Sequence, residues 1–215
     1  MGTRLVVFDC DGVLVDSERL VVRLEAEEIT AIGWPLGVDD VIERFVGRSE
    51  QHMAAEIAAH VEGGLPDGWF DRLRDRTHEL FRAELQPVEG VVDAVRAVQR
   101  EAATCVASSS GHDRLRLVLG LTGLLASFDG HLHSAEDVVH GKPAPDLFLR
   151  AAEQEGYEPT DCVVVEDSVP GVQAAAAAGM RVLGYGAGMT APALLEAAGA
   201  QVFTEMRELP RLAVD

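Results

Sequence analysis

The sequence predicts an α/β fold in which a parallel sheet is covered by helices on both faces and is interrupted by an inserted helical domain. From about residue 87 onward, short apolar segments typical of buried strands alternate with helical segments, which is the pattern of a parallel sheet between helix layers. Residues 17–85 carry helical patterns only, and they follow a single strand at the N-terminus. The helical block is therefore predicted to be an insertion.

Residues 5–18 read LVVFDCDGVLVDSE. An apolar strand is predicted at the start of this segment, and it ends in two acids, Asp9 and Asp11, which Gly12 follows at once. Alternation in an extended chain sends both acids to one side and Cys10 to the other. Two like charges this close repel by about 4 kcal/mol at an effective dielectric near 20. The pair favours a divalent cation between the carboxylates, although a strand that ends in a polar Asp-Gly turn is the simpler alternative.

The helical block begins with residues 17–32, where Ser17 is a suitable N-cap and the apolar residues follow helical spacing. Further helices are predicted at DDVIERF, EQHMAAEIAAHV and DGWFDRLRDRTHELFRAEL. The block inserts directly after the strand that carries the two acids, so we expect a lid that excludes water from that edge. The predicted domains are a core of residues 1–16 with 87–215 and a cap of residues 17–86.

The remaining elements are predicted from local pattern in the order helix 90–101, strand 104–108, helix 112–120, helix 144–156, strand 162–166, helix 168–179 and strand 181–185. Polar residues follow these strands or lie between them: Ser108, Ser109, Ser110, Lys142, Glu166 and Asp167. Right-handed crossovers gather the carboxyl ends of parallel strands at one edge, where open α/β sheets bind ligands. We therefore expect these side chains to meet Asp9 despite their separation in sequence.

Composition narrows the function classes. The chain of 215 residues has 18 basic and 36 acidic residues, a formal charge of −18, which argues against nucleic acid or an anionic membrane as a partner. Its three cysteines lie in apolar runs without paired spacing, so buried free thiols in a reducing cytoplasm are expected. The N-terminal apolar stretch is too short for a membrane span and shows no export signal. A monomer is the default expectation.

His131 and His133 could share one face of a short strand in GHLHSAED. We interpret them as two neutral surface or edge histidines, because the neighbouring sequence shows no third metal ligand.

Four segments taken in order, DCDGVLVDS, the serine after TCVA, GKPAPDLF and VVEDSVPGVQAA, resemble the four motifs of the haloacid dehalogenase superfamily, and more closely its β-phosphoglucomutase-like phosphatase branch. The resemblance covers nearly the whole chain. It implies a Rossmann-like sheet and a small helical cap hinged near residues 14–18 and 83–89. It also implies Mg²⁺-dependent hydrolysis of small phosphate monoesters, of the sugar or polyol phosphate class, so the partner would be a small phosphorylated metabolite.

The same resemblance implies the roles of the two acids at the end of the first strand. Asp9 would be the nucleophile that forms an aspartyl-phosphate, and Asp11 would be the general acid and base. The magnesium ligands would be Asp9, the backbone carbonyl of Asp11 and Asp167. Glu166 would hold the metal directly or through water, or would serve as a structural acid.

The resemblance also implies how the phosphate is held. Ser108 aligns with the phosphate-binding hydroxyl of the family, and Lys142 would bridge the phosphate and the nucleophile as a compact positive charge. Ser109 and Ser110 would either cap the helix that begins near His112 or touch the substrate.

In the predicted cap, the segment Gly47-Arg48-Ser49 resembles the substrate-specificity loop of this branch. Arg48 could bind a second anionic or hydroxyl-rich part of the substrate, or it could be an exposed residue of a helix-helix turn. Arg76 is a weaker candidate for the same task, and a solvated helix face is the alternative.

Three other functions are weighed against hydrolysis. β-Phosphoglucomutases carry a cap histidine where this chain has Val21, which disfavours a mutase. Haloacid dehalogenases need neither the second acid nor a metal, so Asp11 and the Glu166-Asp167 pair argue against carbon-halogen cleavage. Phosphoacceptor signalling modules use a similar Asp, hydroxyl and Lys but are much shorter and have no cap.

Overall fold

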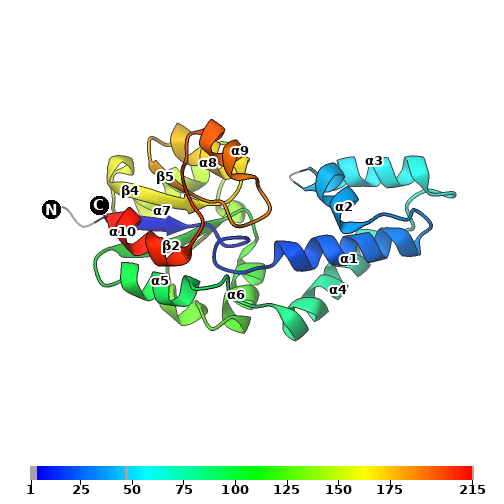
Figure 1. The fold of residues 1–215 in the computed structure, drawn as a ribbon, viewed down its shortest axis with the longest axis horizontal. Coiled ribbons are helices and arrows are strands. Elements are labelled where there is room, and N and C mark those ends of the chain that lie inside the picture. Colours follow the sequence, from blue (N-terminus) through cyan, green and yellow to red (C-terminus); the bar gives the residue numbers. More distant parts are fainter. Residues whose placement is uncertain (1–3, 47, 215) are drawn as a thin grey trace. The chain divides into compact units, whose positions relative to one another are not determined.

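The computed structural model describes residues 4–46 and 48–214, and the chain divides into two compact units. One unit comprises the chain up to Asp16 together with the chain from Gln86 onward, and the other comprises Ser17–Leu85. The first contains a sheet, and the described residues of the second form helices and connecting turns only (Figure 1).

The sheet of the α/β unit has six strands in the order β3-β2-β1-β4-β5-β6, and every pairing is parallel. The strands are β1 (Leu5–Phe8), β2 (Ala103–Ser108), β3 (Leu132–Ser134), β4 (Cys162–Glu166), β5 (Arg181–Tyr185) and β6 (Gln201–Phe203). Strand β1 lies in the middle, with Phe8 level with Val106 of β2 and Val165 of β4. The carboxyl ends of β1, β2 and β4 therefore lie side by side at one edge of the sheet.

Helices cover both faces of this sheet, which explains why the strands read as continuous apolar runs. The helices are α5 (Val91–Val98), α6 (His112–Leu121), α7 (Asp146–Glu155), α8 (Val169–Ala177), α9 (Pro192–Ala198) and α10 (Leu209–Val214). Leu5 and Val7 belong to one core with buried residues of α7 and α8. Val6 and Phe8 point to the opposite face and are equally inaccessible, and Phe8 packs edge-on against Phe128 at 5.7 Å between ring centroids.

The chain leaves and re-enters the α/β unit at the end of β1. Gly12 turns the chain with a φ of +79°, a conformation that favours glycine. Val15 then forms an antiparallel bridge with Pro87, and the Asp16 N–H donates to the Gln86 carbonyl at 3.0 Å. Both connections to the insertion thus start from the sheet edge that carries Asp9.

The helical unit contains α1 (Glu18–Ala31), α2 (Val38–Phe45), α3 (Glu50–His60) and α4 (Trp69–Glu84). Helix α1 packs against α4 and α2, and Ile29, Ile57 and Phe81 are nearly inaccessible in its core. An exposed ion pair between Arg23 and Glu84, at 2.7 Å, joins α1 to α4. This unit buries its own apolar residues and is a compact domain.

The predicted fold class is confirmed, because the strand expected before the two acids of the first segment and the strands expected at 104–108, 162–166 and 181–185 are all members of the parallel sheet. Strand β6 was not predicted and β3 was considered only as a possible short strand. Each has three residues, which is too short to show a hydrophobic period. Among the residues that the structure describes, no helix has the length and apolar character needed to cross a membrane.

Candidate active site

Lys142 lies at the centre of the sheet edge, between the ends of three neighbouring strands. Its Nζ donates to Asp9 Oδ1 at 2.6 Å, to Glu166 Oε1 at 2.7 Å and to the Ala107 carbonyl at 3.2 Å. The lysine side chain is only 5% exposed. One ammonium group therefore joins residues at the ends of β1, β2 and β4.

Glu166 is held on both of its carboxylate oxygens. Oε1 accepts from Lys142, while Oε2 accepts from the Asp167 N–H at 2.9 Å and from the Ser168 N–H and hydroxyl, each at 2.8 Å. The Ser168 hydroxyl also accepts from the Gly171 N–H, which caps α8. A Cβ at Gly171 would fall 1.8 Å from Glu166 Oε1, so only glycine leaves room for this carboxylate. The contacts make Glu166 a rigid partner for Lys142.

Burial dominates the electrostatics of this group. Desolvation raises the pKa of Asp9 to about 7; Lys142 opposes this rise, and the Glu166 carboxylate adds to it. Desolvation alone would lower the pKa of Lys142, but the charges of Asp9 and Glu166 outweigh it, so the lysine pKa is raised. Lys142 is therefore a cation at neutral pH. A further positive charge beside Asp9 would favour the ionised form of the Asp9 carboxyl group.

Asp11 is held by a separate set of donors. The Ser110 hydroxyl donates to Oδ2 and Arg114 Nη2 donates to Oδ1, both at 2.8 Å. The loop that carries Ser110 is fixed in turn, because the Ser110 N–H donates to the Ser108 hydroxyl at 3.1 Å and its carbonyl accepts from Ser134 at 2.8 Å. The loop after β2 thus sets the orientation of the second acid.

Sequence reasoning missed Arg114. It lies in HDRLRLVLG beside Arg116, and nothing in the local pattern separates the two arginines. Arg114 is partly buried against Asp11, whereas Arg116 is exposed. Only the packing of α6 at the sheet edge distinguishes them.

The three consecutive serines at the end of β2 differ in exposure to solvent. Ser108 is the last residue of β2 and is 2% exposed, whereas Ser109 is exposed. Neither Ser109 nor Ser110 is the N-cap of α6, because that position is Gly111. The capping alternative for the two serines is therefore wrong.

The predicted cap residues belong to the helical unit. Arg48 is exposed between α2 and α3, Ser49 caps α3 by accepting from the His52 N–H at 3.2 Å, and Gly47 lies outside the described residues. Arg76 forms an ion pair with Glu28 within the unit. That contact supports a structural role for Arg76.

The oxygen-rich end of β1 suits a hard divalent cation. Asp9 and Asp167 are 7% and 3% exposed, and a Cβ at Gly12 would lie 1.9 Å from Asp167 Oδ2. The Asp167 carboxylate therefore rests against Gly12, where no side chain intervenes. Carboxylate oxygens such as those of Asp9 and Asp167 are the donors that Mg²⁺ prefers.

Comparison of the chain with known proteins shows which family it is similar to. The model of the family described as "Hydrolase: haloacid dehalogenase-like hydrolase" matches residues 3–179. The chain is 34% identical over 187 residues to a probable pseudouridine-5'-phosphatase of Drosophila melanogaster, covering 82% of this chain and 79% of that protein. It is 29% identical over 208 residues to 6-phosphogluconate phosphatase of Escherichia coli K12, covering 96% and 93%.

Among solved structures, a HAD family hydrolase of Deinococcus radiodurans R1 with bound phosphate and sodium superimposes with a TM-score of 0.84 at 31% identity, covering 96% of this chain and 93% of that one. The chain also matches a longer Arabidopsis thaliana protein, SUPPRESSOR OF QUENCHING 1, chloroplastic. It is 33% identical to that protein over 187 residues but spans only 17% of its length.

Proposed function

The chain belongs to the haloacid dehalogenase-like hydrolase family, and we propose that it is an Mg²⁺-dependent phosphatase of small sugar or polyol phosphates that acts through an aspartyl-phosphate on Asp9. The observation that carries this proposal is the pair of acids at the end of β1, which have different partners. Asp9 is bound by the buried Lys142 ammonium, whereas Asp11 is bound by Ser110 and Arg114. Different surroundings suit the two acids to different chemical roles.

In the first half-reaction Asp9 attacks phosphorus. Lys142 engages Oδ1, so we assign Oδ2 as the attacking oxygen. A bond forms between Oδ2 and phosphorus while the bond from phosphorus to the ester oxygen breaks. Asp11, in its protonated form, gives its proton to the leaving alkoxide. Lys142 and the Ser108 hydroxyl are assigned to the phosphoryl oxygens, where positioning and charge neutralisation supply most of the catalysis.

In the second half-reaction Asp11 removes a proton from water. The water oxygen attacks phosphorus, the acyl-phosphate bond breaks, and Asp9 is regenerated as a carboxylate with release of inorganic phosphate. The Ser110 and Arg114 contacts hold Asp11 in one orientation for both proton transfers.

We assign the metal ligands to Asp9, Asp167 and the main-chain carbonyl of Asp11. When bound, Mg²⁺ supplies positive charge for the phosphoryl oxygens and orients them. We assign Glu166 to the positioning of Lys142, because both of its oxygens are already engaged by donors.

Substrate choice is assigned to the helical unit, which we propose to be the cap. Exposed Arg48, in the turn between α2 and α3, is the residue we propose to contact the part of the substrate remote from phosphorus. The relatives named above support this substrate class, because they include a probable pseudouridine-5'-phosphatase and a 6-phosphogluconate phosphatase.

Phosphate release measured across a panel of sugar and polyol phosphates, with and without Mg²⁺, tests the proposal. We expect Mg²⁺-dependent turnover that a chelator abolishes and that Asp9→Asn removes while the circular dichroism spectrum is unchanged. Asp129→Asn, at an exposed acid in the same unit, is the matched control and should keep full activity. Asp11→Asn should lose turnover but keep Mg²⁺ affinity, because its metal contact is assigned to the main chain.

Other outcomes would replace the proposal with a different function. Near-normal hydrolysis by the Asp9→Asn variant would refute the assignment of the nucleophile. Transfer of phosphate between sugar positions without release of inorganic phosphate would show a mutase. Chloride release from a 2-haloacid in the presence of chelator would show a dehalogenase, and stable phosphorylation of Asp9 without turnover would show a phosphoacceptor module.

A further inference from the structure

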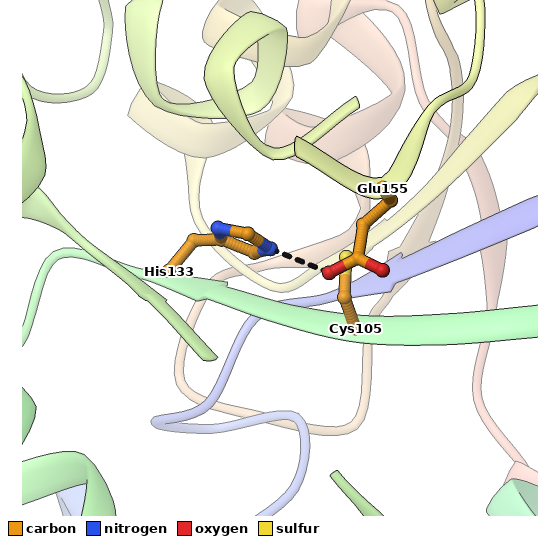
Figure 2. A group of neighbouring side chains, drawn as sticks. All are labelled: Cys105, His133 and Glu155. Atoms are coloured by element: carbon orange, nitrogen blue, oxygen red, sulfur yellow. Dashed lines mark hydrogen bonds and ion pairs between the residues drawn. The ribbon is translucent and has the colours of Figure 1, made fainter. Parts of the chain in front are cut away.

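A second group of ligand-type side chains lies in the α/β unit, away from the strand ends. Figure 2 shows Cys105 of β2, His133 of β3 and Glu155 of α7 pointing toward one another. The Cys105 Sγ, a ring nitrogen of His133 and a carboxylate oxygen of Glu155 all lie within 4.8 Å of one another. Strand β3 is an edge strand, as expected for these histidines, but side chains distant in sequence, Cys105 and Glu155, lie beside His133.

The sheet register explains this meeting. Ala107 is level with His133, so the two side chains leave the sheet on the same face, and alternation puts Cys105 on that face as well. Helix α7 packs on this face through Ala151 and Ala152, and Glu155 is its last residue. The third ligand comes from a helix that begins after Lys142, which local sequence around the histidines does not reveal.

His131 lies beside this group rather than within it, because in the described part of the chain only Cys105, His133 and Glu155 place their ligand atoms within 4.8 Å of one another. The His131 Nδ1 lies 2.8 Å from Glu155 Oε2, while His133 Nε2 lies 2.8 Å from Oε1, so one carboxylate is flanked by two imidazole rings. Cys105 is inaccessible, and the side chains of His133 and Glu155 are 9% and 11% exposed. The His131 side chain is 52% exposed. The group is thus closed on the protein side and reached from solvent past His131.

We propose that Cys105, His133 and Glu155 form the core of a structural site for a zinc-class divalent cation, which ties β3 and α7 to β2. His131, whose Nδ1 lies 2.8 Å from the other oxygen of Glu155, would turn toward the metal as the fourth ligand. One thiolate, two imidazoles and one carboxylate are a four-ligand set suited to tetrahedral Zn²⁺. A thiolate with two imidazoles disfavours Mg²⁺, which takes oxygen ligands. Zinc bonds of about 2.0–2.3 Å separate tetrahedral ligands by roughly 3.3–3.6 Å. Side-chain rotations that move the ligand atoms of Cys105, His133 and Glu155 by about 1 Å reach this spacing. His131 lies outside the group and has to rotate farther.

This site is distinct from the proposed magnesium site. Cys105 precedes Ser108 by three residues, which is about 10 Å along a strand that rises 3.3 Å per residue. Its donors include sulfur and nitrogen, whereas the donors at the end of β1 are all oxygen. The two sites should therefore bind different metals.

Proton release is part of the binding step. Burial raises the pKa of the Cys105 thiol, and the negative charge of Glu155 adds to the rise. The metal forms a bond to Sγ as the thiol proton passes to solvent, and no oxidant or reductant is required.

Cobalt titration of the metal-stripped protein, with saturating Mg²⁺ present, tests the proposal. We expect one Co²⁺ per chain, intense tetrahedral visible bands, a near-ultraviolet sulfur-to-cobalt charge-transfer band, and displacement of the cobalt by Zn²⁺. Cys105→Ser should abolish the charge-transfer band, while Cys162→Ser, at a buried thiol outside the group, should keep it. Asp167→Asn should also keep the band, because the site does not use the catalytic carboxylates.

Zn²⁺ affinity and thermal stability give a second readout. His133→Gln should weaken Zn²⁺ binding more than about 100-fold, since changes beyond the direct ligands alone cost 10–100-fold. His140→Gln, at an exposed histidine outside the group, should change nothing. Zn²⁺ should raise the Tm of the wild type but not that of Cys105→Ala, which removes the thiol without adding a polar group to the core.

Three results would overturn the site. The first is the absence of a thiolate band in the wild type. The second is a band of equal strength in the Cys105→Ser protein. The third is zinc binding that disappears in Asp167→Asn and persists in His133→Gln. Any of these would leave Glu155 as a hydrogen-bond partner of two histidines without a metal.

Discussion

Arg114 donates from Nη2 to Asp11 Oδ1 at 2.8 Å and thereby links helix α6 to the second acid of the proposed site. Both side chains are partly buried, at 29% and 21% exposed. The Ser110 hydroxyl holds the other oxygen of Asp11. Arg114 is therefore assigned as a positioning residue for Asp11.

Arg114→Met should lower kcat by about 10–100-fold with a small change in KM, because loss of orientation removes part of the 10²–10⁴-fold contribution of general acid-base catalysis. Its pH profile should also change, since a charged partner of Asp11 is lost. Arg116→Met is the matched control on the same helix. Equal kinetics for the two variants would remove Arg114 from the mechanism.

Gly12→Ala should weaken Mg²⁺ binding at least tenfold and reduce activity in parallel, because the new Cβ would collide with the Asp167 carboxylate. Calorimetric Mg²⁺ titration measures the affinity. Gly123→Ala has a similarly positive φ but open space around it, so it incurs only the backbone cost of about 1–2 kcal/mol. If both variants bind Mg²⁺ equally well, Asp167 is not held against Gly12 in solution.

Lys142→Met should lower the free energy of unfolding by about 3–5 kcal/mol, because it leaves Asp9 and Glu166 as buried carboxylates without their cation. Urea unfolding in the presence of a chelator measures the loss. Lys142→Arg should rescue the charge but not the activity, because the guanidinium is larger and planar.

The loss caused by Lys142→Met should grow as pH rises. Burial already raises the pKa of Asp9 to about 7, and removing the cation raises it further. A carboxyl group with a raised folded-state pKa destabilises the folded protein increasingly as pH climbs from its unfolded value, near 3.9, through the folded value. A smaller loss at pH 8 than at pH 5 would contradict the buried charge pair.

Asp137→Asn should lower the free energy of unfolding at neutral pH, and this loss should shrink as the pH falls. The pKa of Asp137 is lowered in the folded protein, whereas that of Asp9 is raised. Burial raises the pKa of Asp137, but the Ser134 N–H and His112 outweigh it, so the net pKa is lowered. The carboxylate therefore stabilises the fold above its unfolded pKa, near 3.9, and this contribution disappears as pH falls through the lower folded value.

Urea unfolding of Asp137→Asn and wild type between about pH 6 and pH 3 checks the sign. The two curves should converge at the acid end, and Asp129→Asn, at an exposed acid, should track the wild type throughout. A gap that is constant with pH would assign the effect to packing.

Lys142 is the only lysine of the chain, since the other 17 basic residues are arginines. It is also the cation that contacts both Asp9 and Glu166. A compact ammonium with three donors fits between two carboxylates and a carbonyl, where a planar guanidinium does not. All of the other Lys and Arg positions of the chain are arginines. Lysine occurs at position 142, where the space between Asp9 and Glu166 suits an ammonium group.

Local sequence was sufficient for the four longer strands, for the helical insertion and for the polar residues at the strand ends. Apolar runs such as Leu5–Phe8 and Cys162–Glu166 have few ways to be buried except in a sheet covered on both sides. Residues that follow such strands must come to the same edge once the strands are parallel. This is why Asp9, Lys142 and Glu166 could be grouped without coordinates.

Other features of the fold and of the site depend on tertiary packing and could not be predicted from local sequence. The strand order, the choice of Arg114 over Arg116 as the partner of Asp11, and the meeting of Cys105 with His133 and Glu155 depend on contacts between segments far apart in the chain. A hydrophobic period reports which face of an element is buried, but it carries no information on which distant element covers that face. Side-chain partners across elements are therefore a property of the folded chain.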